Sequence, residues 1–82
     1  MWTVQYEGAF DAWQAADHPN TDRLVAVLTW ILRFIDLGPP DDALPVPIEE
    51  DLYVSRVPDA EVFATYLALG HERWAKIRHF RS

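Results

Sequence analysis

The sequence predicts an α+β domain in which an antiparallel sheet packs on a hairpin of two helices, in the order β-α-α-β-β-β. Three observations carry this prediction. Apolar residues recur at helical spacing over 22–37, apolar and polar residues alternate near both ends of the chain, and Gly38-Pro39-Pro40 ends the helical pattern. We assign residues 1–82 to one domain, because a chain of 82 residues supports a single hydrophobic core.

The first two predicted elements are a strand over 2–6 and a short helix over 9–16. Large apolar residues occupy every second position of 2–6, which is the period of a half-buried strand. Phe10 and Trp13 lie three residues apart among alanines, which is the spacing of one amphipathic helix face. Pro19 then disfavours helical geometry in the residue before it, so a turn follows the first helix.

A second, longer helix is predicted over 22–37, with Asn20 or Thr21 as its N-terminal cap and Gly38 as its C-terminal cap. Trp30 lies near the edge of its polar stripe, so we expect this side chain to be partly exposed. The apolar stripe expected to face the sheet consists of Leu24, Val27, Leu28, Ile31, Phe34 and Ile35.

The second half of the chain is predicted to form most of the sheet. Residues 38–51 contain four prolines and five acids, which is typical of an extended connector on the surface. The segments 52–57, 61–69 and 73–81 read as three strands of an antiparallel meander, joined by short turns. We expect the first strand to join the same sheet.

Charge is distributed unevenly along the chain. The protein has seven Lys and Arg against thirteen Asp and Glu, a formal net charge of −6. The basic residues of the last twelve positions are Arg73, Lys76, Arg78 and Arg81. This asymmetry indicates a surface for an anionic partner or an acidic protein segment.

Several classes of site are not expected. The chain has no cysteine, which excludes disulfides and thiolate metal sites, and the spacing of its acids fits no calcium loop. We therefore expect neither a metal nor another cofactor. The N-terminus does not resemble a signal peptide, and the apolar stretch 24–37 is too short to span a bilayer, so a cytoplasmic protein with no membrane partner is expected.

Regular alternation assigns the side chains of the last strand to two faces. Ala75 and Ile77 suit the helix side, and His79 and Arg81 alternate onto that side with them. The opposite, open face would carry Trp74, Lys76, Arg78 and Phe80. Cations flanked by aromatic rings suit phosphates and bases, and Arg56 would join them if it shares this orientation. The alternative is that Lys and Arg merely discourage edge pairing.

Four segments in chain order carry a resemblance to a known family. They are the first helix Phe10-Asp-Ala-Trp13, the helix end Leu37-Gly38-Pro39, the segment from Ile48 to Val57 around Arg56, and the closing Ile77-Arg-His79-Phe80-Arg81. Together they resemble the RelE/ParE toxin superfamily, especially its HigB-like, phage-associated branch. The resemblance spans nearly the whole chain.

The resemblance implies a sheet on a two-helix hairpin and a toxin of a toxin–antitoxin pair, with an antitoxin protein as partner. RelE- and HigB-like members bind the ribosome and cleave mRNA, whereas ParE-like members inhibit DNA gyrase. By position, the resemblance makes Arg56 a catalytic candidate of an endoribonuclease. His79 is the candidate for proton transfer, with His71 as the alternative, because they are the only acid/base side chains near the basic strand. The residues expected to contact RNA or a partner are Lys76, Arg78, Arg81, Arg73 and Trp74.

The chain departs from the family pattern at three places. Glu61 stands where the third strand usually bears an arginine, and Val54 stands where the preceding strand has a glutamate. The sequence also ends at Ser82, before the basic or tyrosine-bearing tail of many members. These departures favour binding over cleavage.

Two alternatives therefore remain open. The first is a binding module without chemistry: a gyrase inhibitor, a degenerate toxin, or a phage-encoded protein that blocks a host protein through its acidic side and residues 38–51. The second is an oligomerisation domain, for instance a homodimer, that uses an exposed patch of Trp30, Trp74 and Phe80.

Overall fold

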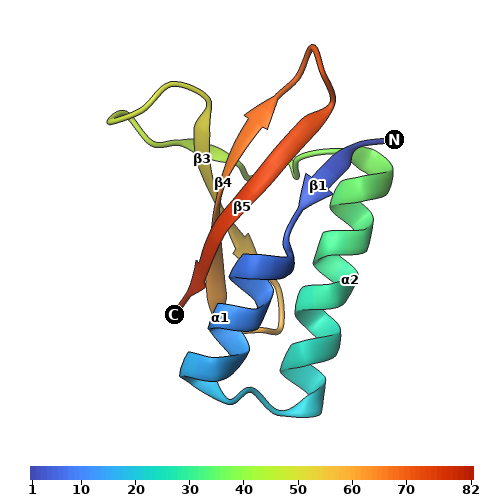
Figure 1. Ribbon diagram of the computed structural model, residues 1–82, viewed down its shortest axis with the longest axis vertical. Coiled ribbons are helices and arrows are strands. Elements are labelled where there is room, and N and C mark those ends of the chain that lie inside the picture. The colour runs from blue at the N-terminus through green and yellow to red at the C-terminus, as the bar shows by residue number, and fades with distance from the viewer.

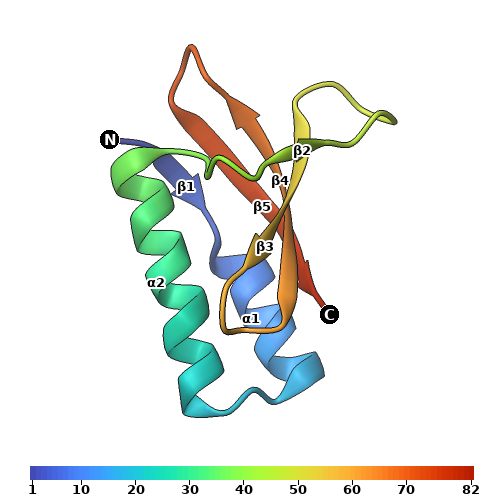
Figure 2. The ribbon, with the colours of Figure 1, turned by 180° about the vertical axis from the view of Figure 1, so that it is seen from behind.

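The computed structural model describes all residues from 1 to 82 as an α+β domain with two helices and a mixed, five-stranded sheet. The elements are β1 (Thr3–Gln5), α1 (Glu7–Asp17), α2 (Thr21–Leu37), β2 (Leu44–Pro45), β3 (Leu52–Val57), β4 (Val62–Leu69) and β5 (Trp74–Arg81). The strands lie in the order β1-β5-β4-β3-β2 (Figures 1 and 2). The predicted α+β class is confirmed, and β2 is an additional short strand within the predicted connector.

The prediction of an antiparallel sheet is wrong for β1, which pairs with β5 in parallel. The other neighbouring strands pair antiparallel. The chain path explains the difference. Helix α1 continues in the direction of β1, and α2, β3, β4 and β5 each reverse the direction of the element before them (Figures 1 and 2). As a result, β5 runs the same way as β1.

Both helices contribute to one hydrophobic core on one face of the sheet. At its centre, the ring of Trp30 lies edge-on to those of Phe34, Tyr66 and Phe80, at centroid distances of 5.5, 5.9 and 6.2 Å. Buried Ser55 and Tyr66 share a hydrogen bond of 2.7 Å between their hydroxyl oxygens. The core is therefore built around aromatic rings supplied by a helix and two strands.

Helix α2 is rotated relative to the predicted stripe. Trp30 is only 7% exposed, which overturns the expected partial exposure, whereas Leu28 is 39% exposed. The larger apolar surface of a tryptophan explains why the helix buries this side chain in preference to a leucine. Burial of Trp30 removes it from any exposed oligomerisation patch.

The helix ends follow the predicted caps. The side-chain oxygen of Asn20 accepts a hydrogen bond from the backbone nitrogen of Arg23 at 2.9 Å, so Asn20 is the cap of α2. Gly38 ends this helix with φ of 87°, a conformation that favours glycine. Neither helix is long and apolar enough to cross a membrane.

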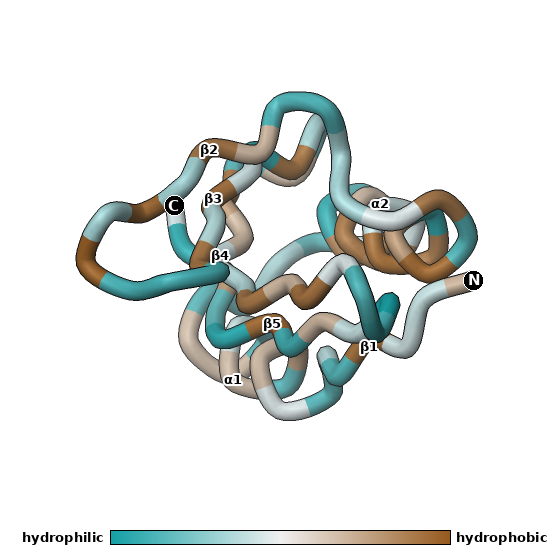
Figure 3. Tube along the Cα trace, turned by 90° about the horizontal axis from the view of Figure 1, so that it is seen from above, coloured by the Kyte–Doolittle hydropathy of each residue, from teal (hydrophilic) through white to brown (hydrophobic).

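The segment between β2 and β3, which we term the acidic loop (residues 46–51), projects away from the helices (Figures 2 and 3). Hydrogen bonds from Val46 N to Leu52 O (2.9 Å) and from Ala68 N to Asp51 O (3.0 Å) anchor its two ends. Ile48 is 87% exposed, and three acids follow it in the sequence. Figure 3 shows the hydrophobic tip of this loop and, next to it, a hydrophilic stretch that leads back to the sheet. The loop is thus held to the sheet while its tip remains exposed.

Candidate functional site

The side of the sheet opposite the helices, which we term the open face, carries the cationic side chains of β3 and β5. Strand register fixes which residues share this face, because directly paired residues point to the same side. The three successive rows across β3, β4 and β5 are Arg56–Phe63–Arg81, Val54–Thr65–His79 and Leu52–Leu67–Lys76. An arginine, a lysine or a histidine therefore occurs in every row.

A β-bulge in β5 determines the composition of this face. Thr65 pairs with His79 and Tyr66 pairs with Ile77, so Arg78 is an extra residue without a partner in β4. Arg78 and His79 are consecutive residues outside the core, between the buried Ile77 and the buried Phe80. The bulge thus places both Arg78 and His79 on the open face.

The bulge overturns part of the predicted assignment for β5. Phe80 is only 4% exposed and packs in the core, with ring centroids 6.0 Å from Trp13 and 6.2 Å from Trp30. His79 and Arg81, predicted on the helix side, belong to the open face instead. Regular alternation gave the wrong side because an extra residue shifts every later side chain to the other face.

The remaining predicted residues divide between the face and its surroundings. Lys76 and half-buried Trp74 lie on the open face as predicted, and Arg56 joins them. Arg73 does not, because it lies in the β4–β5 turn with φ of 49°, at the opposite end of β5 from Arg81. Glu61 also lies in a turn, with φ of 58°, and precedes β4 rather than beginning it.

Arg78 is paired with the acidic loop. Its guanidinium donates two hydrogen bonds to the carboxylate of Glu49, at 2.6 and 3.1 Å. The only other salt bridge in the protein joins Arg23 to Asp17. Arg56, Lys76 and Arg81 therefore have no salt-bridge partner and remain available to an anion. Sequence reasoning missed Glu49, which looked like one of several solvated loop charges.

The environment of His79 favours its neutral form. Partial burial and the positive charges of Arg81 and Arg78 hold the pKa of this imidazole below its ordinary value of 6.5. A neutral imidazole near pH 7 can accept a proton, and the neighbouring guanidinium groups can hold a phosphate. His71 lies in the β4–β5 turn and does not belong to this group.

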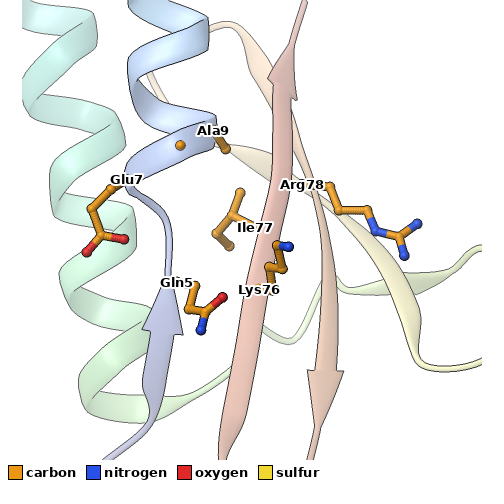
Figure 4. A pocket seen from close by; sticks show the side chains of 7 residues that line it. Gln5, Glu7, Ala9, Lys76, Ile77 and Arg78 are labelled. Carbon is orange, nitrogen blue, oxygen red and sulfur yellow. The ribbon is translucent and has the colours of Figure 1, made fainter.

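An open hollow of about 570 Å³ borders the site where β1 leaves β5. Figure 4 shows Gln5 and Ile77 between the two strands and Arg78 directed away from them. Its lining residues are Gln5, Glu7, Gly8, Ala9, Lys76, Ile77 and Arg78. Its polar side chains carry both signs of charge, so the hollow offers less to an anion than the open face does. No group of three or more His, Asp or Glu side chains is arranged to hold a metal ion.

Comparisons with models of known protein families, with curated proteins and with solved structures give no match to this chain. The chemistry of the open face is therefore the main basis for a functional proposal. It combines cations without salt-bridge partners, a histidine whose pKa is lowered, and an aromatic side chain at the surface.

Proposed function

We propose that this protein is the toxin-like component of a toxin–antitoxin pair, and that it inhibits translation by binding mRNA at the ribosome through its open face. The observation that supports this most is the β-bulge, because it brings His79 and Arg81 onto the face that also holds Arg56, Lys76 and Arg78, opposite the helices. Clustered cations on one face are the electrostatic pattern of nucleic-acid binding. Because the sequence resembles RelE- and HigB-like toxins, mRNA at the ribosome is the expected target of this surface.

The cations would act on the phosphates of the RNA. Arg56, Arg81 and Lys76 have no intramolecular salt bridge, so phosphate binding by them disrupts no ion pair. Arg78 would exchange the carboxylate of Glu49 for a phosphate. Guanidinium groups suit this role because they bind phosphate oxygens bidentately.

Cleavage, if it occurs, would proceed by attack of a ribose 2′-oxygen on the adjacent phosphorus, with departure of the 5′-oxygen. His79 is the proposed base, because its neutral form can take the proton of the 2′-hydroxyl. Arg56 would stabilise the negative charge that develops on the phosphate oxygens. No second imidazole shares the open face, so water would supply the proton to the leaving oxygen.

The proposal is tested by expressing the protein in bacteria. Growth arrest with loss of translated mRNA is expected, and a variant carrying Arg56→Gln, Lys76→Gln and Arg81→Gln should restore growth while keeping the wild-type melting temperature. Rescue by a small protein encoded beside this gene would identify the antitoxin. Normal growth during expression, together with intact mRNA on purified ribosomes, would exclude this function.

A non-catalytic binding module is the second candidate, and the Glu49–Arg78 pair favours it. The pair occupies one of the open-face cations, and the net charge of −6 opposes binding to RNA in general. Such a protein would use the acidic loop or the acidic side of α1 and α2 to bind gyrase or another host protein. Arg56→Ala combined with Arg81→Ala keeps the Glu49–Arg78 pair and would then leave the activity intact, whereas loss of activity would exclude this candidate.

A further inference from the structure

Phe63 is an aromatic side chain that the fold leaves at the surface. Of the four tryptophans, three tyrosines and four phenylalanines, only Phe63 is exposed, with 50% of its surface accessible. It lies in the middle strand of the meander and belongs to neither the hydrophobic core nor the residues packed against it. The fold therefore does not use this ring for packing in the core.

The neighbours of Phe63 on the open face are both arginines. Arg56 is its partner in β3 and Arg81 is its partner in β5, so the ring lies between two cations in one row of the sheet. Side chains directly opposite each other in a sheet are close enough to contact the same ligand. Neither guanidinium lies over the ring, since the only cation–π contact in the protein joins Arg23 to Trp13.

We infer that Phe63 is a stacking site for one base of single-stranded RNA, and that Arg56 and Arg81 hold the phosphates on either side of that base. This inference rests on the proposed function and names the part of the RNA that the open face recognises besides its charge. An aromatic ring stacks on any base, because every base has a π face, whereas the cations contact only the backbone. An unpaired strand is required, because the bases of a duplex are already stacked on one another.

The structure explains why these three residues lie together. Arg81 reaches the open face only because the bulge at Arg78 and His79 shifts the end of β5. Without that shift, Phe80 would point to this face and Arg81 toward the helices. The same irregularity therefore completes the hydrophobic core with Phe80 and places the second arginine beside Phe63.

The test measures binding of a fluorescently labelled RNA 12-mer with 2-aminopurine at one position. Phe63→Leu should weaken binding about 5- to 150-fold, which corresponds to the 1–3 kcal/mol of one base–aromatic stack. Phe63→Trp should keep or improve the affinity. Since phosphate contacts remain, Phe63→Leu should leave the salt dependence of binding unchanged. Arg56→Gln should lower the slope of log affinity against log salt by about 0.7.

Two controls separate stacking from charge and from unfolding. Inorganic polyphosphate, which has no bases, should bind the wild type and Phe63→Leu with equal affinity. Leu32→Ala changes another exposed apolar residue, on α2, and should leave RNA affinity and 2-aminopurine quenching at wild-type values. A change in quenching with Phe63→Leu and Phe63→Trp would support the inference directly.

The outcomes distinguish this inference from the proposed function. If the RNA binds equally well to wild type and Phe63→Leu, with the same quenching, the stacking site is excluded while the RNA-binding function stands. If wild type binds neither the 12-mer nor polyphosphate, both are excluded. If only an acidic peptide binds to the open face, the surface recognises protein, and both are again excluded.

Discussion

Glu49 and Arg78 are 29 residues apart in the sequence, yet the carboxylate of one and the guanidinium of the other form two hydrogen bonds across the open face. The acidic loop thus places a carboxylate on one of the residues proposed to bind RNA. A carboxylate and a phosphate present similar oxygen acceptors to a guanidinium group. Glu49 is therefore a competitor, within the protein, of any anionic ligand for Arg78.

Replacing Glu49 should strengthen RNA binding. Glu49→Gln frees Arg78 and removes a negative charge beside the site, and an exposed salt bridge contributes about 0.2–1 kcal/mol. We therefore expect up to about a fivefold gain in affinity for single-stranded RNA, with little change in the free energy of unfolding. Fluorescence anisotropy at constant salt measures this gain.

Glu50→Gln is the matched control for this prediction, because it changes the net charge equally and Glu50 forms no salt bridge. The gain of Glu49→Gln should exceed that of Glu50→Gln, and it should disappear when Arg78→Gln is combined with it. Equal gains in both single variants would mean that only net charge matters and that the pair does not compete with RNA.

His79 should make the stability of the fold depend on pH. Its pKa in the folded protein lies below the ordinary value of 6.5, because of its burial and then because of Arg81 and Arg78. As pH falls through 6.5, the unfolded chain binds a proton before the folded one does, so the free energy of unfolding decreases. Urea denaturation between pH 8 and 5 should show this decrease, and His79→Gln should reduce it. An equal decrease in both proteins would contradict the assignment.

RNA binding should favour the protonated form of His79, whereas the free protein favours the neutral form. A phosphate beside the imidazole favours its protonated form and raises its pKa, so RNA binding is coupled to proton uptake. The affinity of the wild type should therefore increase more as pH is lowered below 7 than that of His79→Gln. NMR titration of the His79 ring, with and without RNA, would measure the two pKa values. A ring that titrates identically in both would place the phosphates elsewhere.

The spacing of apolar residues and the signals at the ends of elements predicted most of the fold. The helix over 22–37 and the strand over 52–57 were found because their apolar spacing and their end signals agree, and both lie within one residue of the observed bounds. The parallel pairing of β1 was not predicted, because alternation over 2–6 gives no strand direction. The residues that α2 buries differ from the predicted stripe, because the helix turns the large ring of Trp30 toward the core and leaves Leu28 exposed.

The site was predicted less completely than the fold, for a local reason. A bulge is one residue long, and the prediction assumed regular alternation throughout β5. The apolar residues Ala75, Ile77 and Phe80 did carry a signal, since their spacing changes from two to three residues. The pairing of Glu49 with Arg78 had no such signal, because it depends on how a long connector crosses the sheet.

Arg23 joins three parts of the fold, and its removal should destabilise the protein. Its Nε donates to the backbone oxygen of Ala60 at 2.9 Å, its Nη2 donates to Asp17 at 3.1 Å, and its guanidinium lies 5.6 Å from the ring centre of Trp13. Ala60 is buried in the β3–β4 turn, so its carbonyl would lose this partner. Arg23→Ala should cost about 1–3 kcal/mol of stability, measured by urea denaturation.

Arg33→Ala is the control for Arg23, because this exposed arginine on the same helix makes no salt bridge. It should change the free energy of unfolding by less than about 0.5 kcal/mol. Arg23→Lys should recover only part of the loss, because an ammonium group lacks the planar fork that reaches two partners. If Arg23→Ala and Arg33→Ala had the same effect, the contacts of Arg23 would not stabilise the fold.

The three glycines should differ sharply in their tolerance of a methyl group. Gly38 has φ of 87°, and a Cβ there would lie 2.6 Å from Nε1 of Trp2. Gly38→Ala should therefore cost at least about 1–3 kcal/mol and shift tryptophan fluorescence as the indole moves. Gly70→Ala meets no atom within 4 Å and should be close to neutral, whereas Gly8→Ala, in the first turn of α1, should stabilise by up to about 1 kcal/mol. Thermal denaturation orders the three variants, and a wild-type melting temperature for Gly38→Ala would contradict the close approach of Trp2.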